Sequence, residues 1–319
     1  MRLLLIVLLT AMGAPAVWAA RVDALLAKFI PADTVSLMGA RMDQLRQTPL
    51  YVKMMAQQKL PQLDQFARET GFDPRTDVQE LLVASPAEPD ASVVMAHGWF
   101  HPIHLEKIQV EKFEGYNIYA GPEHPVRPGV VGNGKSGFVL IDASTAVAGP
   151  VDRVKRAISQ YKGGGKTVPK DLLDRARAIG DEYQIWAVSQ GGWNFLSTQL
   201  PQTGSGVNFG KIFQNLDRTV FEADLRNGLK AAAMGDCKTS EDAKNLSDGA
   251  RGLVGFGRLS VPDNQPELLK LWDAIQVAQN DRQIVIRADI PQNLIDQLVA
   301  MFQAAPPRAV RPPHRMKPL

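Results

Sequence analysis

The sequence predicts an α+β protein with two related halves, each in the order β-α-β-β-α-β, with antiparallel sheets and helices on one face. Three observations support this prediction: short β-rich runs that follow one another in pairs, amphipathic helical segments between them, and a partial repeat between the halves. The length of 319 residues leaves room for one large domain or two modest ones. A hydrophobic content of 45% and a charged content of 22% are typical of a folded chain.

The repeat is clearest where each half ends. Pro150 and Pro291 each precede a segment with the same apolar pattern, and aligning them places Val154 on Ile295. Apolar residues at spacings of three and four form one face of a helix, and proline suits the start of such a helix. The earlier parts of the halves match more weakly and need short insertions. We therefore expect an internal duplication.

The expected elements of the first half follow from apolar runs bounded by turn residues. Strands are expected near 34–40, 79–84, 92–98, 114–120 and 137–148. Helices are expected near 42–71, with breaks at Pro49 and Pro61, and near 102–110 and 150–162. Gly71 suits the end of its helix because glycine readily adopts the left-handed conformation found there.

The second half repeats this layout. Strands are expected near 183–190, 218–225, 228–235, 273–279 and 283–288, and helices near 193–199, 239–256, 263–271 and 291–303. Residues 162–166 read Lys-Gly-Gly-Gly-Lys, which is typical of a flexible joint. The predicted domains are therefore 20–165 and 166–305.

The two ends of the chain differ from the body. Residues 1–19 begin with one cation, Arg2, followed by a short apolar run and small residues up to Ala19, which is the pattern of a cleaved signal peptide. The apolar run is too short to span a bilayer, and no later stretch is long enough either. We expect an exported protein, periplasmic or secreted, without a transmembrane segment after cleavage.

Residues 306–319 are rich in proline and basic side chains and hold little apolar bulk. Such a segment cannot bury enough surface to offset the entropy lost on ordering, so we expect a disordered basic tail. Its charge favours weak contact with anionic surfaces. The whole chain carries 36 Lys+Arg against 33 Asp+Glu, an excess too small to indicate a nucleic-acid partner.

The catalytic templates in the sequence are all incomplete. Residues 129–136 have the spacing of a phosphate-binding loop, but a proline-rich run precedes them and a strand follows, which reverses the required context. Ser159 and Lys162 have the spacing of acyl-serine enzymes without the companion motifs. Cys237 is the single cysteine and is expected to be a small buried residue. We predict that the chain is not an enzyme and needs no cofactor.

A histidine-rich segment leaves one alternative open. His97, His101, His104 and Glu106 lie within ten residues, and imidazole with a carboxylate can bind a divalent metal such as zinc. Against this, Pro102 indicates a helix start at which His101 can serve a capping role. The comparable place in the second half has no histidine. A metal site at these four residues is therefore the alternative hypothesis.

Four short sequence motifs, taken in their order along the chain, are similar to those of a known group of proteins. They are residues 72–78 (Phe-Asp-Pro-Arg-Thr-Asp-Val), 98–100 (Gly-Trp-Phe), 116–119 (Tyr-Asn-Ile-Tyr) and 145–149 (Thr-Ala-Val-Ala-Gly). In this order the chain resembles a group of exported bacterial proteins of unknown function, over most of residues 30–305. The resemblance implies a shared layout, and it transfers no activity and no functional residues.

The sequence thus predicts an exported, non-catalytic protein that binds a protein partner or an envelope component. Two alternatives remain: a metal-binding protein that uses the histidine segment, and a carrier of an apolar ligand held between the sheet and its helices. The carrier hypothesis requires an internal pocket.

Overall fold

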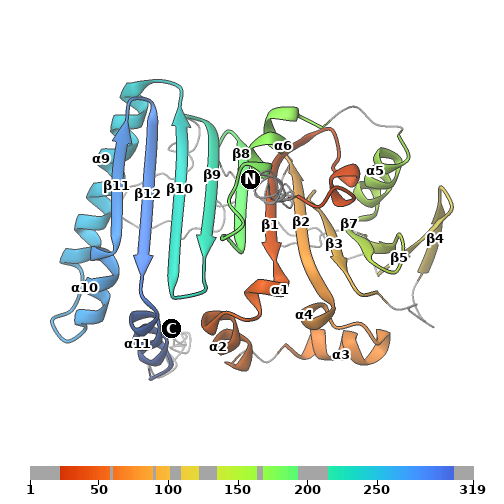
Figure 1. Ribbon diagram of the computed structural model, residues 1–319, viewed down its shortest axis with the longest axis horizontal. Helices are drawn as coiled ribbons and strands as arrows, with labels where there is room; N and C mark the ends of the chain where they lie inside the picture. The colour runs from red at the N-terminus through yellow and green to blue at the C-terminus, as the bar shows by residue number, and fades with distance from the viewer. Residues whose placement is uncertain are drawn as a thin grey trace, which may run out of the picture.

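The structure is a computed structural model that describes residues 22–57, 60–88, 91–100, 109–121, 135–163, 168–192 and 215–304. The predicted signal peptide, the basic tail and residues 101–108 of the histidine-rich segment lie outside these ranges. Within them, helices combine with one antiparallel sheet (Figure 1), so the predicted α+β class is confirmed. No helix in the described ranges is both long and apolar enough to cross a membrane.

The first half contains one 3-10 helix, seven strands and five helices among its described residues. They are η1 (Leu26–Phe29), β1 (Thr34–Arg41), α1 (Met42–Leu45), α2 (Pro49–Gln57), α3 (Pro61–Thr70), α4 (Pro74–Asp77), β2 (Val78–Pro86), β3 (Val93–Gly98), β4 (Gln109–Phe113), β5 (Tyr116–Ala120), β6 (Ser136–Leu140), β7 (Thr145–Pro150) and α5 (Val151–Tyr161).

The second half follows with the remaining elements of the described chain. They are α6 (Lys170–Arg177), β8 (Ile185–Gln190), β9 (Leu216–Asp224), β10 (Leu229–Cys237), α9 (Ser240–Leu259), α10 (Pro266–Asp273), β11 (Ile275–Asn280), β12 (Gln283–Ile290) and α11 (Gln292–Ala304). Helix α9 begins at a regular N-cap, where the Thr239 hydroxyl accepts a hydrogen bond from the Asp242 N–H at 3.0 Å.

The strands form one continuous sheet in the order β11-β12-β10-β9-β8-β1-β2-β3-β7-β6-β5-β4 (Figure 1). The expectation of two sheets is therefore corrected. The halves join because β1 pairs antiparallel with β8, from Ser36 opposite Ser189 to Ala40 opposite Ile185. The internal duplication itself stays a prediction.

Helices cover both faces of this sheet. The largest core lies on one face, where strand residues meet α5, α6 and η1, and it includes Leu37, Leu82, Met95, Trp186, Val154 and Leu172. We call this the α5 face. The predicted boundary at 165/166 does not divide this core, because Leu172 of α6 packs with residues of the first half.

Helix α9 packs on the opposite face. The register places Val188, Val220, Met234 and Val285 in one row across β8, β9, β10 and β12. Successive strand residues point to opposite sides, so Ile284 and Ile286 face away from the α5 face. These two residues pack with Ala243 of α9. The expectation of helices on one face is therefore wrong, because a broad sheet with two apolar sides must bury both.

Two further local predictions differ from the structure, and one helix of the structure was not expected. The run 137–148 forms a hairpin, β6 and β7, whose turn is held by the Ser144 N–H donating to the Asp142 carboxylate at 2.7 Å. The end of the expected helix 102–110 lies in strand β4. Helix α6 was not predicted, although its buried Leu172 and Ala176 are four residues apart as an amphipathic helix requires.

Candidate functional site

A row of polar side chains crosses the α5 face at the end of the sheet where β1 stops, the lower end in Figure 1. Arg41 on β1 lies opposite Glu80 on β2, Glu80 lies opposite His97 on β3, and His97 lies opposite Thr145 on β7. Gln184 extends the row on the other side, since the Arg41 N–H donates to its carbonyl at 2.8 Å. We call these five residues the polar row. Its neighbours on this face, Leu37, Leu82 and Met95, belong to the apolar core.

Arg41 is a fixed cation in this row. Its Nε and Nη2 donate to the Asp43 carboxylate at 3.3 and 3.1 Å. This hydrogen bonding is the main reason why the pKa of Arg41 lies above its ordinary value, and it outweighs the opposing effect of burial. The negative charges of Glu80 and Asp181 act in the same direction. Arg41 therefore links the row to the loop that precedes β8.

Gln184 holds that loop in place. It is fully buried, its Oε1 accepts from the Leu225 N–H at 2.7 Å, and its Nε2 donates to the Glu182 carbonyl at 2.5 Å. A buried amide with both ends bonded keeps one orientation, because turning it would leave polar atoms unpaired. The neighbouring Asp181 and Glu182 are thereby presented at the end of the sheet.

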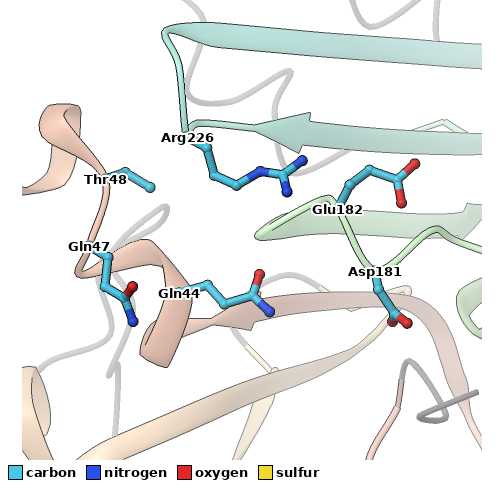
Figure 2. A pocket seen from close by; sticks show the side chains of 6 residues that line it. All are labelled: Gln44, Gln47, Thr48, Asp181, Glu182 and Arg226. Atoms are coloured by element: carbon cyan, nitrogen blue, oxygen red, sulfur yellow. The ribbon is translucent and has the colours of Figure 1, made fainter.

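A polar pocket lies beside the row, at the junction of the two halves (Figure 2). Its volume is 480 Å³, and its lining residues are Gln44, Gln47, Thr48, Asp181, Glu182 and Arg226. The first half supplies Gln44, Gln47 and Thr48, from α1 and the turn after it (Figure 2). The loop before β8 and the turn between β9 and β10 supply the other three. The pocket therefore exists only because β1 and β8 pair.

The walls of the pocket are held by local hydrogen bonds. The Thr48 hydroxyl donates to the Leu45 carbonyl at 2.8 Å, and Gln47 Nε2 donates to the Asp43 carbonyl at 3.0 Å. On the opposite wall, Arg226 donates to the Asp224 carboxylate at 2.9 and 2.7 Å. This pairing lowers the pKa of Asp224 and raises that of Arg226. Both groups keep their charges at neutral pH.

The predicted metal ligands are only partly covered by the structure. His97 is half-buried, and its Nδ1 has no hydrogen-bond partner among the described residues. His101, His104 and Glu106 lie outside the described residues, so the four-residue set is not tested. Within the described ranges, no three His, Cys, Asp or Glu side chains come together as a metal site.

Most of this site could not be predicted from the sequence. Glu80, Asp181, Glu182 and Arg226 are far apart in the chain and belong to no motif. The one available signal was the acidic pair Asp181-Glu182 directly before a strand. The prediction for Cys237 is confirmed, because this residue is 1% exposed and burial raises the pKa of its thiol, with smaller effects from Asp242, Asp236 and Asp217.

Comparison with known proteins yields a likeness of fold. The chain matches crystal form III of a protein named TP0453 with a TM-score of 0.50 and 9% identity, over 86% of this chain and 97% of that one. Crystal form I of TP0453 gives a TM-score of 0.47 and 10% identity, over 89% and 99% of the two chains. The fold is similar to that of TP0453. No protein-family model and no curated protein matches the sequence.

An identity this low carries the arrangement of strands and helices and nothing about activity. The resemblance to exported bacterial proteins therefore stays a prediction. The site has to be interpreted from its own residues.

Proposed function

We propose that the chain is an exported, non-catalytic protein that binds a protein partner or an envelope component, and that the polar pocket with the adjoining row is its binding site. The observation that carries this proposal is that both halves contribute to the pocket lining. Sites at the junction of two structural units are common places for ligands. The predicted signal peptide supports export.

The state of the charged groups supports binding rather than catalysis. Arg41 and Arg226 are each engaged by a carboxylate two residues away, and these pairs leave both side chains as permanent charges. Such groups orient a polar partner and do not exchange protons near neutral pH. The one cysteine is buried, which keeps its thiol away from any substrate.

A capture experiment tests the proposal. The mature chain, starting after Ala19, is tagged and used to retrieve proteins from envelope extracts. We compare it with the double variant Asp181→Asn, Glu182→Gln, which removes both pocket carboxylates while keeping their shape. The matched control is Glu241→Gln, Asp263→Asn, which alters two exposed carboxylates on and beyond α9.

We expect the unaltered chain and the control to retrieve the same partner, and the pocket variant to lose at least nine-tenths of it, roughly 1.4 kcal/mol of binding free energy. Equal retrieval by all three chains would show that the pocket does not bind the partner.

A metal-binding protein is the second candidate, and one observation favours it. The unpartnered Nδ1 of His97 lies on the strand next to Glu80, so an imidazole nitrogen and a carboxylate stand on neighbouring strands. Native mass spectrometry of the mature chain, purified without chelator, tests this candidate. We expect one bound metal ion that His97→Ala removes; an unaltered chain that carries no metal would exclude it.

A further inference from the structure

Strand β11 is the outer strand of the sheet, and its own residues lack the features that usually protect such an edge. Its six residues, Ile275–Asn280, contain no charge, no proline and no glycine. Their pairing with β12 is regular, without a bulge. The edge strands of β-sheets are commonly protected by charged side chains, prolines or bulges, because an open row of backbone N–H and carbonyl groups can pair with another chain. Figure 1 shows β11 as the last strand on its side, with α9 and α10 beside it.

The backbone groups that point outward can be assigned from the hairpin. Asn280 and Gln283 face each other across the turn, so hydrogen-bonded pairs recur at every second residue before Asn280. The Ala274 carbonyl accepts a hydrogen bond from the Asp289 N–H at 3.3 Å, as this alternation of hydrogen-bonded residues requires. The N–H and carbonyl groups of Ile275, Val277 and Gln279 therefore point away from β12.

One side-chain contact reaches this outward row among the described residues. Arg251 of α9 donates from Nη2 to the Val277 carbonyl at 3.4 Å, and its Nη1 also pairs with Asp248 at 3.1 Å. The Arg251 side chain is 48% exposed, and a long contact at the surface is easily exchanged for a backbone hydrogen bond. The contact confirms that the Val277 carbonyl points outward.

We propose that two copies of this chain associate by antiparallel pairing of their β11 strands. A two-fold axis at Val277 places Val277 opposite its own copy and Ile275 opposite Gln279 of the second copy. Each pair exchanges two backbone hydrogen bonds, so every outward group of the three residues is satisfied. The exposed residues between them, Gln276 and Ala278, are uncharged, so the side chains of the two strands meet without like-charge repulsion.

Strand β4, at the opposite edge of the sheet, has the protective features that the residues of β11 lack. Strand β4 carries Glu111 and Lys112, and Glu111 forms an ion pair with Lys155 of α5. The Lys155 ammonium also lies 5.7 Å from the centre of the Phe113 ring, which ties this edge to α5. An edge that is charged and bound to its own helix is a poor template for a second copy.

Exposed apolar side chains lie on the two helices that contact β11. Phe256 and Leu259 of α9 are 64% and 89% exposed, and Leu269 of α10 is 41% exposed. A six-residue strand spans about 20 Å and buries too little area for a tight dimer by itself. We therefore expect a reversible dimer with a dissociation constant of about micromolar size, in which these side chains add apolar contact.

Sedimentation velocity of the mature chain over a range of concentrations tests the proposal. Val277→Pro is the main variant, because it removes an outward N–H and leaves every bond to β12 in place. Val110→Pro is the matched control on β4: Phe113 and Tyr116 close that hairpin, so the Val110 N–H also points outward. Ala278→Lys is a second variant at an exposed position, and it adds a cation on each copy close to the two-fold axis.

We expect the unaltered chain and Val110→Pro to shift from monomer to dimer with rising concentration. Val277→Pro and Ala278→Lys should raise the dissociation constant at least tenfold while circular dichroism stays unchanged. A chain that sediments as a monomer at every concentration would overturn the proposal. So would a folded Val277→Pro variant that dimerises normally, or loss of the dimer in Val110→Pro.

Discussion

Gly39 on β1 lies directly against the indole of Trp186 on β8. The two residues are cross-strand neighbours, and a Cβ atom added at Gly39 would come within 2.2 Å of Trp186 Cε2. Trp186 is 1% exposed and belongs to the largest core cluster. The pairing of β1 with β8 joins the two halves, so this contact lies at their junction.

Gly39→Ala is expected to destabilise the protein by about 2 kcal/mol, because the buried indole has no free space into which it can move. The change should lower the midpoint of urea unfolding, followed by tryptophan fluorescence. An unchanged midpoint would mean that the core around Trp186 can relax, and that the close approach of the two strands is not required.

Gly252→Ala is expected to have the opposite effect. Gly252 is an exposed residue within α9, and an added Cβ would meet no atom within 4 Å. Alanine restricts the unfolded chain and favours the helix, so the variant should gain about 0.5–1 kcal/mol in free energy of unfolding. The same urea titration measures it, and a lower midpoint would contradict the described helix.

Gln184→Ala is expected to lower stability and weaken partner capture together. The variant leaves the buried Leu225 N–H without its acceptor, which costs about 2 kcal/mol, and it releases the loop that carries Glu182. Gln276→Ala, at an exposed position on β11, is the control and should change neither property. Thermal unfolding and the capture assay are measured on both variants. Normal capture by a destabilised Gln184→Ala chain would show that the position of this loop is not required for partner binding.

Acid should weaken the fold through Asp33. Its carboxylate accepts hydrogen bonds from the buried Arg153 guanidinium at 2.7 and 3.0 Å, and this contact is the main reason why the pKa of Asp33 lies below its ordinary value. A group with a lowered folded pKa stabilises the protein above its unfolded pKa of about 4 and loses this contribution as the pH falls through the folded value.

The Asp33 contribution is measured by urea unfolding at pH 6 and at pH 3. We expect Asp33→Asn to be less stable than the unaltered chain at pH 6, with a smaller difference at pH 3. Asp263→Asn, at an exposed position, is the control. A difference for Asp33→Asn that stays constant between the two pH values would show that its charge does not contribute.

Cys237 should resist thiol reagents in the folded protein. Its side chain is buried and burial raises the pKa of the thiol, so little thiolate is present and reagents reach it poorly. A colorimetric disulfide reagent at pH 8 is expected to titrate no thiol in the native chain and one thiol in urea. Rapid native reaction would place Cys237 at an accessible site.

Much of the fold could be predicted from local patterns, and the site could not. Proline before an apolar helical repeat identified α5 and α11, because each signal lies within a few neighbouring residues. Glu80 and Asp181 carry no such signal, since only the pairing of distant strands brings their charges near Arg41. Likewise, no local pattern indicates that β11 ends the sheet.

The α+β class, most of the strands and the helix starts follow from local patterns, because hydrophobic periodicity and turn residues act over short distances. Tertiary structure alone decided that the halves share one sheet, that helices cover both of its faces, and that a pocket opens where β1 meets β8. These features depend on which strands pair and in what register. Pairing is selected by the packing of whole faces, as with Gly39 and Trp186, and not by any single segment.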